Sequence, residues 1–315
     1  MTPPGADLYR SRHRLRRLAG AVFGIACLLA TLTGVVVLTV LLGAVIVAAL
    51  RPPPEHPWYD LLGNARELFG YLRFLAGKFG SSFPAKAGYR AGIAGTLWLL
   101  ALTALLAIPI GVGAAVYLEE FAPPGRLRRA IQVNIANLAG VPSIVYGILG
   151  LAAFARAFGF APMALGKSLW SGALTLGLLI LPVIIITTQE ALRAVPSSLR
   201  QGAMALGATR WQVVRDHVLP SALPGILTGT ILALSRAIGE TAPLLMVGAA
   251  ASIRWVPNGP GDLYTALPVE IYNYATRPDR AFQSVAAGGI LILMILLLSM
   301  NAVAILIRNR SQGHR

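Results

Sequence analysis

Residues 201–220 read QGAMALGATRWQVVRDHVLP and lie between two long apolar runs of the chain. Connections between neighbouring helices are usually much shorter than this. The first half of the segment consists mainly of small residues, and the segment ends in Leu219-Pro220. Small side chains give a low surface that can enter a groove on another protein. We therefore expect a membrane protein that docks a partner on one side of the bilayer.

The composition of the chain is that of a membrane protein. Of its 315 residues, 56% are hydrophobic and 12% are charged, whereas soluble domains carry about 25% charged residues. A membrane-spanning helix needs about 20 apolar residues. Six runs reach about that length: Leu18–Leu50, Ala91–Leu118, Ala130–Ala155, Ser168–Gln189, His217–Ser235 continuing past two charges to Ile253, and Ala281–Ile307. The predicted fold class is all-α, a polytopic integral membrane protein with six transmembrane helices.

Basic residues indicate which connections face the cytoplasm. Of the 27 Lys and Arg residues, 15 lie in the two tails and in connections 119–129 and 190–220, and 11 lie in the other connections. Cytoplasmic loops carry an excess of Lys and Arg, so both termini and segment 190–220 are expected inside. The predicted division is a cytoplasmic basic tail at 1–17, a first transmembrane helix at 18–50, a periplasmic segment at 51–90, a five-helix core at 91–307 and a cytoplasmic tail at 308–315.

The net charge of +15 does not indicate nucleic-acid binding. The Arg and Lys residues form short blocks beside apolar runs, where such residues set topology and contact lipid headgroups. They form no single face with interleaved aromatic residues. We predict membrane lipid as a partner and no nucleic acid.

Two outer segments carry secondary-structure signals. Pro52-Pro53-Pro54 ends the first span, and residues 61–74 have helical apolar spacing, which predicts a helix along the outer membrane interface. The stretch Trp255–Tyr274 is rich in Pro, Gly and Tyr and predicts an irregular loop with at most one short helix. Two interpretations stay open for these surfaces: contact with an external partner, or packing against lipid.

The sequence lacks patterns for catalysis, metal binding and nucleotide binding. APMALGKS at 161–168 ends like a phosphate-binding loop, but it begins with Ala and no strand precedes it. The four histidines are scattered, and Cys27 is the single cysteine. We therefore predict no catalytic residue, no metal site and no cofactor bound by this chain, so that any ATP must be hydrolysed by another protein.

The 201–220 segment combines three groups of residues suited to docking. They are small residues (Ala203, Ala205, Gly207 and Ala208), an apolar ridge at near-helical spacing (Trp211, Val213, Val214 and Val218) and charged residues (Arg210, Arg215 and Asp216). Pro196 and Pro220 are expected to stop the flanking helices from running through the segment. The alternative is an amphipathic loop that lies on the inner membrane face.

The spacing of this segment resembles the coupling loop of importer-type ABC transporter permeases. The pattern of that family is Glu-Ala-Ala, three residues, Gly, nine residues, an aliphatic residue, any residue and Leu-Pro. Ala203, Gly207 and Leu219-Pro220 match it, whereas Gln201, Gly202 and His217 replace the Glu, the first Ala and the aliphatic residue. The resemblance implies that this loop seats in an ATPase subunit. It assigns that coupling to Gln201, Ala203, Gly207, Ala208, Arg210, Leu219 and Pro220.

The next span carries two charged residues. Small residues recur at every fourth position of the same span, namely Gly225, Gly229, Ala233 and Ala237, which allows close approach of another helix. Arg236 and Glu240 are also four residues apart and can pair, with Ser235 and Thr241 close by. A charge at mid-membrane costs about 3 kcal/mol. Glu240 either neutralises Arg236 within a helix bundle or holds its planar fork for an anion.

Two stretches are similar to the phosphate-importing permeases, specifically their A-type subunit: SRAIGETAPLLMVG at 235–248 and NIANLAGVPSIVYGILG at 134–150. The similarity covers roughly residues 91–307 and implies a type I ABC importer core, multi-pass in the bacterial cytoplasmic (inner) membrane. It implies as partners a homologous C-type permease subunit, a dimeric ATP-binding subunit that uses ATP-Mg at the cytoplasmic face, and a periplasmic phosphate-binding protein.

The second stretch has polar and helix-loosening residues in an apolar run. Asn134 and Asn137, with Gly140, Pro142 and Gly147, fit a pathway wall or a gating bend. Ordinary hydrogen bonds between helices are the alternative for the two asparagines.

Together these patterns predict the permease subunit of an ATP-driven phosphate importer, which forms half of the translocation pathway. The predicted pathway residues are Arg236, Glu240, Ser235, Thr241, Asn134 and Asn137. Another oxyanion, such as sulfate, molybdate or phosphonate, is the nearest alternative, because arginine chemistry does not separate them. An enzyme would need a carboxylate cluster or a His or Cys nucleophile in the spans, and an ATP-independent carrier would not need the Gly207 segment.

Overall fold

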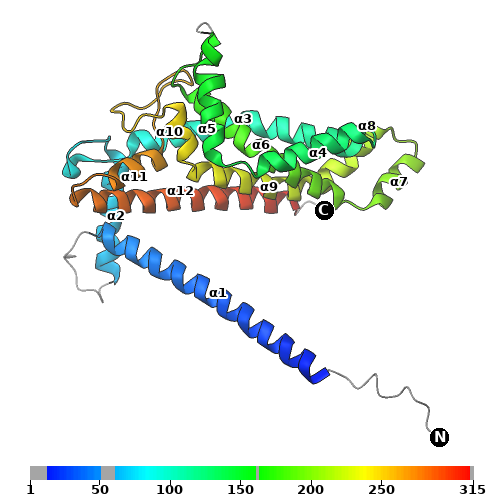
Figure 1. Ribbon diagram of the computed structural model, residues 1–315, viewed down its shortest axis with the longest axis horizontal. Helices are drawn as coiled ribbons and strands as arrows, with labels where there is room; N and C mark the ends of the chain where they lie inside the picture. Colours follow the sequence, from blue (N-terminus) through cyan, green and yellow to red (C-terminus); the bar gives the residue numbers. More distant parts are fainter. Residues whose placement is uncertain (1–12, 51–60, 161–162, 313–315) are drawn as a thin grey trace.

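The computed structural model describes residues 13–50, 61–160 and 163–312. The start of the predicted basic tail, the Pro52-Pro53-Pro54 stop and the last three residues of the C-terminal tail lie outside these ranges. Within them the chain is helical and forms no strand, apart from an isolated β-bridge between Ser168 and Leu263. The predicted all-α fold class is confirmed (Figure 1).

The helices fall into long and short ones. The long ones are α1 (His13–Ala49), α3 (Arg90–Val116), α6 (Leu169–Arg193), α9 (Leu219–Gly239) and α12 (Ala281–Gln312). The short ones are α2 (Leu61–Gly77), α4 (Arg126–Ala139), α5 (Ser143–Gly150), α7 (Ser197–Ala205), α8 (Arg210–Val213), α10 (Ala242–Val247) and α11 (Leu267–Ala275). Single π-helical turns are η3 (Tyr117–Phe121), η4 (Leu151–Ala155) and η7 (Val214–Val218), and short 3-10 turns are η2 (Pro84–Lys86) and η5 (Ala157–Gly159). By length and composition, five helices of the described ranges are able to cross a membrane, and the bent pair of α4 and α5 makes a sixth when it is taken as one span.

Helix α6 is the centre of the bundle and packs against both α3 and α9. Glycines allow this close approach: a Cβ at Gly111 of α3 would lie 2.7 Å from Ile184, and one at Gly225 of α9 would lie 2.7 Å from Ala191. The small-residue row predicted on α9 is therefore a packing surface, and it faces α6.

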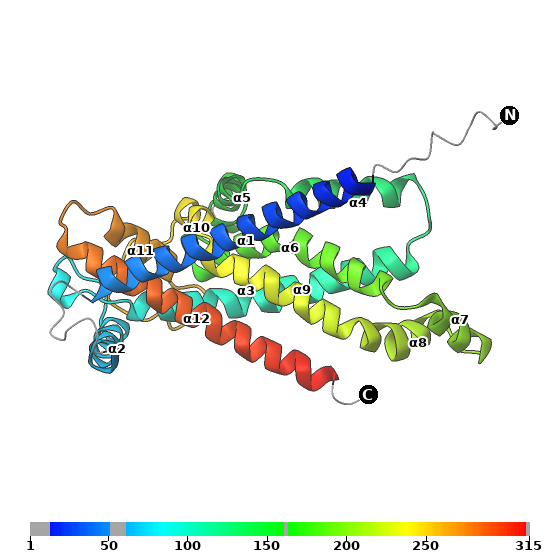
Figure 2. The same ribbon diagram turned by 90° about the horizontal axis from the view of Figure 1, so that it is seen from below.

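The two ends of the elongated molecule differ (Figure 2). Helices α7 and α8 form one end, and α2 and α11 lie at the other. The N-terminal end of α1 and the C-terminal end of α12 both lie toward the α7–α8 end (Figure 1). Helix α1 diverges from the body, contacts α12 around Ala49 and leaves most of its own surface exposed.

The predicted third span, 130–155, consists of two helices joined by a bend, which is one of the interpretations that Gly140 and Pro142 left open. Helices α4 and α5 meet at an angle of 101°, and Figure 1 shows α5 upright against the long axis of the body. The break falls at Gly140-Val141-Pro142, because Pro142 has no N–H to donate and disfavours helical backbone before it. Across the bend, the Tyr146 hydroxyl donates a hydrogen bond of 2.8 Å to the Leu138 carbonyl.

The predicted continuation of the fifth span to Ile253 is wrong as one unbroken helix. Helix α9 ends at Gly239, and the backbone of Glu240 is extended. Helix α10 then begins with Pro243 in its first turn, a position that proline favours. It packs against α5, where a Cβ at Gly147 would lie 2.7 Å from the Pro243 Cα. The helix therefore breaks at Glu240, and the chain goes on along α6 as α10, where a Cβ at Gly248 would lie 2.7 Å from Lys167, close to the start of α6.

The outer segments match their predictions within the described residues. The helix predicted at 61–74 is α2, and the stretch 255–274 is irregular up to the short helix α11. Glu270 of α11, which the sequence pattern did not mark, is fully buried against α3. A Cβ at Gly92 of α3 would lie 2.5 Å from its Oε2. The Gly92 N–H faces this carboxylate and partly favours its charged form. Burial raises the pKa of Glu270 to about 8.

This pKa predicts how stability depends on pH. The ordinary value of 4.5 applies to the unfolded chain, so the unfolded state loses a proton that the folded state keeps between about pH 5 and pH 8. Stability therefore falls as pH rises through this window, by on the order of 1.4 kcal/mol for each unit of pKa difference. Thermal unfolding of purified protein should show this fall in the wild type and a flatter profile in Glu270→Gln. The exposed Glu190→Gln is the control, and parallel wild-type and Glu270→Gln profiles would contradict the assignment.

Candidate functional site

Helix α7 begins after Pro196 and ends in a turn that requires glycine. Gly207 has a φ of +85°, in the left-handed region. The Gly207 N–H donates to the Met204 carbonyl at 3.0 Å, and the Ala208 N–H donates to the Ala203 carbonyl at 3.2 Å. These are the paired bonds of a Schellman motif, which satisfies the last carbonyls of a helix. Gly207 is therefore the residue that ends α7.

The next helix begins at once with a capping box. The Gln212 N–H donates to the Thr209 hydroxyl at 3.4 Å, and the Thr209 N–H donates to Gln212 Oε1 at 2.8 Å. From Arg210 the chain is helical through η7 into α9. The prediction that Pro220 stops this helix is wrong: Pro220 lies in the first turn of α9, directly after the π-helical turn. Pro196, in contrast, does separate α6 from α7.

The segment from α7 to η7 has a buried side and an exposed side. Ala203, Val213 and Val218 pack with the end of α6. On the other side, next to Gly207, Leu206 is 91% exposed and Met204 is 48% exposed. These uncovered apolar side chains make the turn a surface suited to docking a partner.

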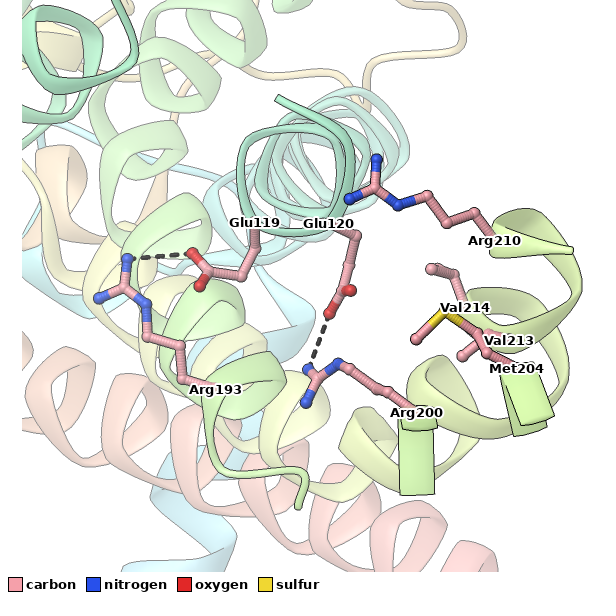
Figure 3. A pocket seen from close by; sticks show the side chains of 8 residues that line it. All are labelled: Glu119, Glu120, Arg193, Arg200, Met204, Arg210, Val213 and Val214. Atoms are coloured by element: carbon pink, nitrogen blue, oxygen red, sulfur yellow. Dashed lines mark hydrogen bonds and ion pairs between the residues drawn. The ribbon is translucent and has the colours of Figure 1, made fainter. Parts of the chain in front are cut away.

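A cavity of about 380 Å³ lies between this segment and the end of α3 (Figure 3). Its lining is Glu119, Glu120, Arg193, Arg200, Met204, Arg210, Val213 and Val214. Beside the cavity, the rings of Phe121 and Trp211 face each other at a centroid distance of 6.5 Å. The cavity is therefore framed by charged residues from three separate parts of the chain.

Two glutamates of η3 pair with arginines from three helices. Glu119 Oε2 accepts from Arg128 of α4 at 3.3 Å and from Arg193 of α6 at 3.0 Å. Glu120 Oε1 accepts from Arg200 of α7 at 2.8 Å. The side chains of Glu119 and Glu120 are only 15% and 11% exposed. A hydrogen bond to a charged group contributes about 1.5–3 kcal/mol, so these pairs hold η3 against α4, α6 and α7 more firmly than pairs between fully exposed residues would.

Arg200 also closes the end of α6. Its Nη1 donates to the Val195 carbonyl at 2.7 Å, and its Nη2 donates to the Leu192 carbonyl at 2.8 Å. The last carbonyls of a helix lack partners within the helix and favour a nearby cation. A single guanidinium therefore connects α6, α7 and the end of α3.

This charged cluster was not predicted from the sequence, where connection 119–129 indicated only the topology. The available signal was the adjacent Glu119 and Glu120, two of only 12 acidic residues, in a connection that is otherwise basic. Their partners Arg193 and Arg200 lie 74 and 80 positions away, and sequence spacing gives no means of pairing residues at that distance.

The predicted ion pair between Arg236 and Glu240 is present, with 3.3 Å from Nε to Oε1. Arg236 lies in the last turn of α9, and its side chain is 43% exposed. Leu232, one turn earlier, is 61% exposed. This ridge therefore faces away from the body of the chain. Tyr146 of α5 lies within electrostatic range of Arg236.

The structure does not gather all the predicted pathway residues around this pair. The Ser235 hydroxyl donates to Asn301 of α12 at 2.6 Å and so connects two helices. Thr241 directly precedes α10. Asn134 and Asn137 are exposed on α4, which packs against α6. The pathway roles of these residues stay predictions.

Comparison with known proteins identifies the family. Residues 107–312 match the family model of the binding-protein-dependent transport system inner membrane component. The chain belongs to this family. The permease is 35% identical over 238 residues to the probable ABC transporter permease protein YqgI of Bacillus subtilis, which covers 71% of this chain and 79% of the relative.

Relatives named for phosphate transport are also similar to this permease. It is 38% identical over 215 residues to the phosphate transport system permease protein PstA 1 of Mycobacterium tuberculosis, covering 68% of each chain. It is 33% identical over 227 residues to PstA of Haemophilus influenzae, covering 71% of this chain and 77% of the relative. The predicted resemblance to phosphate-importing permeases is confirmed.

Solved ABC transporters share the fold of this permease. A chain of a bacterial transporter for the acidic polysaccharide alginate aligns with a TM-score of 0.62 at 16% identity, covering 93% of this chain and 99% of the other. A chain of the inward-facing MetNI methionine transporter aligns with a TM-score of 0.56 at 21% identity, covering 70% and 96%. The predicted type I ABC importer fold is confirmed. The protein is the membrane component of an importer-type ABC transporter.

The Schellman turn predicts opposite effects for two neighbouring glycines. Alanine at Gly207 must adopt the left-handed conformation, which costs about 1–2 kcal/mol. Alanine at Gly202 lies within α7 in open space and should stabilise the helix by about 0.5–1 kcal/mol. In hydrogen exchange of the purified permease, the amides at positions 207 and 208 should exchange about tenfold faster in Gly207→Ala, and no faster than wild type in Gly202→Ala. Equal exchange in the two variants would contradict the role of Gly207.

Proposed function

We propose that this permease forms half of the translocation pathway of an ATP-driven importer of inorganic phosphate. The observation that carries the proposal is the Arg236–Glu240 pair on an uncovered ridge of α9. The planar fork of arginine suits bidentate binding of a phosphate group, and an ionised residue within a span is by default a candidate functional site. Glu240 holds the fork in place and offsets its charge when the site is empty. The relatives named for phosphate transport support this choice of anion.

The partners of the proposed importer meet different faces of the chain. A homologous C-type permease subunit covers the exposed ridge of α9 and supplies the other half of the pathway. A dimeric ATP-binding subunit docks at the cytoplasmic α7–α8 end, where Gln201, Arg210 and the turn at Gly207 are exposed, and it uses ATP-Mg there. A periplasmic phosphate-binding protein delivers the anion at the opposite end, beside α2 and α11 (Figure 2). Both termini are then cytoplasmic, in a multi-pass protein of the bacterial inner membrane.

The proposed mechanism follows from the continuity of one helix. The helical stretch from Arg210 to Gly239 has 30 residues, which corresponds to a length of about 45 Å. Its first turns belong to the docking segment, and its last turn carries Arg236. A displacement that the ATPase imposes on α8 therefore reaches the anion contact along one rod. Leu219 and Pro220 lie within this rod and pass the displacement on.

The choice of anion needs a direct test, because the same fold serves transporters of methionine and alginate. Sulfate, molybdate and phosphonate are the alternatives that arginine chemistry also allows. Uptake of labelled phosphate, in competition with each of these anions, separates them. A transporter that takes up sulfate or molybdate in preference to phosphate would contradict the proposed substrate.

Removal of Arg236 should abolish phosphate uptake. Loss of a charged hydrogen-bonding pair is worth about 1.5–3 kcal/mol, so cells with Arg236→Ala should import labelled phosphate at least tenfold more slowly. Arg236→Lys should give an intermediate rate, because lysine keeps the charge but not the fork. The exposed Arg73→Ala on α2 is the matched control and should import at the wild-type rate. Wild-type rates in both Arg236 variants, at normal membrane levels, would exclude the pathway role.

The docking assignment predicts a specific crosslink. In a Cys27→Ser background, Ala208→Cys should crosslink to the ATP-binding subunit, because residue 208 directly follows the exposed turn at Gly207. Lys86→Cys, exposed in η2 on the far side of the bundle from α7, should not. Crosslinked products are identified by mass spectrometry of the purified membrane complex. If residue 208 forms no such product and no ATPase co-purifies, the coupling assignment is wrong.

A further inference from the structure

We propose that Glu120 and Arg200 form a linkage through which the docking segment moves α3, so that the segment drives two spans and not α9 alone. The linkage makes both residues positioning residues for transport. It rests on the proposed function, in which an ATPase moves the α7–α8 segment.

The docking segment, α7 to η7, is connected to the end of α3 by side-chain contacts and not by a continuous helix. Glu120 and Arg200 are 80 positions apart in the chain, yet Oε1 and Nη2 lie 2.8 Å apart. The neighbouring residue Phe121 faces Trp211 at a ring distance of 6.5 Å. Consecutive residues of η3 thus contact α7 and α8, and Figure 3 shows Glu120 turned toward Arg200 while Glu119 turns toward Arg193.

The backbone at this point departs from the regular α-helix. Residues 117–121 form a π-helical turn that ends with the Ala122 N–H donating to the Tyr117 carbonyl at 2.8 Å. Single π-helical turns inside helical spans occur frequently at functional sites. Here the turn lies where α3 meets the docking segment, and it carries both glutamates of the cluster.

Direct packing between α3 and α9 at this level is apolar: Val112 and Val116 of α3 pack in one cluster with Ala222 and Ile226 of α9. An apolar hollow of about 660 Å³ lies between them, with Ile108 and Tyr117 of α3 on one side and Leu219 and Leu223 of α9 on the other. Val112 and Val116 of α3 touch the buried side of the segment. Such apolar contacts are non-directional, whereas a charged hydrogen bond fixes both distance and direction.

Arg200 is well placed to transmit a displacement. Its guanidinium is held at three points, on Glu120 and on the carbonyls of Leu192 and Val195. Its side chain is 21% exposed and that of Glu120 is 11% exposed, so water does not readily replace either partner. When α7 moves, the end of α3 is therefore drawn along with the end of α6.

The test uses the complete transporter, with its second permease subunit and ATPase, in proteoliposomes with the binding protein. ATP hydrolysis and phosphate uptake are measured in the same vesicles. Glu120→Gln should keep the ATPase bound and hydrolysing at the wild-type rate, while phosphate imported per ATP falls about tenfold, within the usual range of coupling between sites. Glu190→Gln, an exposed carboxylate at the same end of α6, is the matched control and should keep the wild-type ratio.

A covalent link should restore coupling. In a Cys27→Ser background, Glu120→Cys combined with Arg200→Cys should show the same loss of phosphate imported per ATP. Joining the two positions with a short bismaleimide should recover most of the ratio, because the link replaces the ion pair. Recovery distinguishes transmission from a merely structural role, which a crosslink between side chains would not repair.

The movement of α3 is measured independently of the transported anion. Spin labels at the exposed positions Leu105→Cys on α3 and Ile295→Cys on α12 report the ATP-dependent change in their separation. The wild type should show this change, and the further substitution Glu120→Gln should abolish it. An unchanged separation in the wild type, or the same change with Glu120→Gln, would overturn the linkage.

Other outcomes are equally decisive. Loss of the ATPase from Glu120→Gln would show that the pair builds the docking surface, and an equal loss of coupling in Glu190→Gln would show a general charge effect; both overturn the proposal. A wild-type complex whose α3 moves with ATP while no phosphate enters would instead contradict the proposed substrate and leave the linkage supported.

Discussion

The fold depends on close packing of several helices against α6 through residues without bulky side chains. Lipid tails are as apolar as leucine, so helices in a bilayer gain little hydrophobic free energy by meeting and rely on close contact. Gly111 of α3, Gly150 of α5 and Gly229 of α9 each approach a different position on α6. Because α6 fixes these three elements in one frame, the charged cluster at its end and the Arg236 ridge on α9 have defined positions relative to each other.

Local patterns in the sequence predicted the features that local forces determine. The spans follow from apolar runs. The family spacing singled out Gly207 without predicting a turn, and the Schellman motif shows that Gly207 ends α7. The pairing of Arg236 with Glu240 was predictable because one helical turn separates them. A bend near Pro142 was one interpretation of its stretch, because proline and glycine loosen a helix. The break at Gly239 was missed, because hydropathy continues through it and carries no information on direction.

The features that the sequence did not predict depend on distant parts of the chain. Glu119 and Glu120 looked like ordinary charges of an inner connection until α6 and α7 supplied their arginines. Glu270 lies in a stretch predicted to be mostly irregular, and α11 packs it against Gly92 of α3. The partners and neighbours of each of these carboxylates lie more than 70 positions away in the chain or come from packing between helices. The periodicity of residues within one helix carries no information on such contacts.

The helix that runs through the π-helical turn η7 explains why the number of residues in the docking segment, α7 to η7, matters more than the identity of each residue. Each residue turns a helix by about 100°, so the loss or gain of one residue between Gly207 and Pro220 would rotate the exposed turn about the axis of α9. Such a rotation would point Leu206 in a new direction and separate Trp211 from η3. Gln201 and His217, the departures from the family pattern, are both exposed and leave this angle unchanged. The number of residues between Gly207 and Pro220 thus fixes the angle at which the exposed turn projects from the axis of α9, and with it the direction in which the turn faces a docked partner.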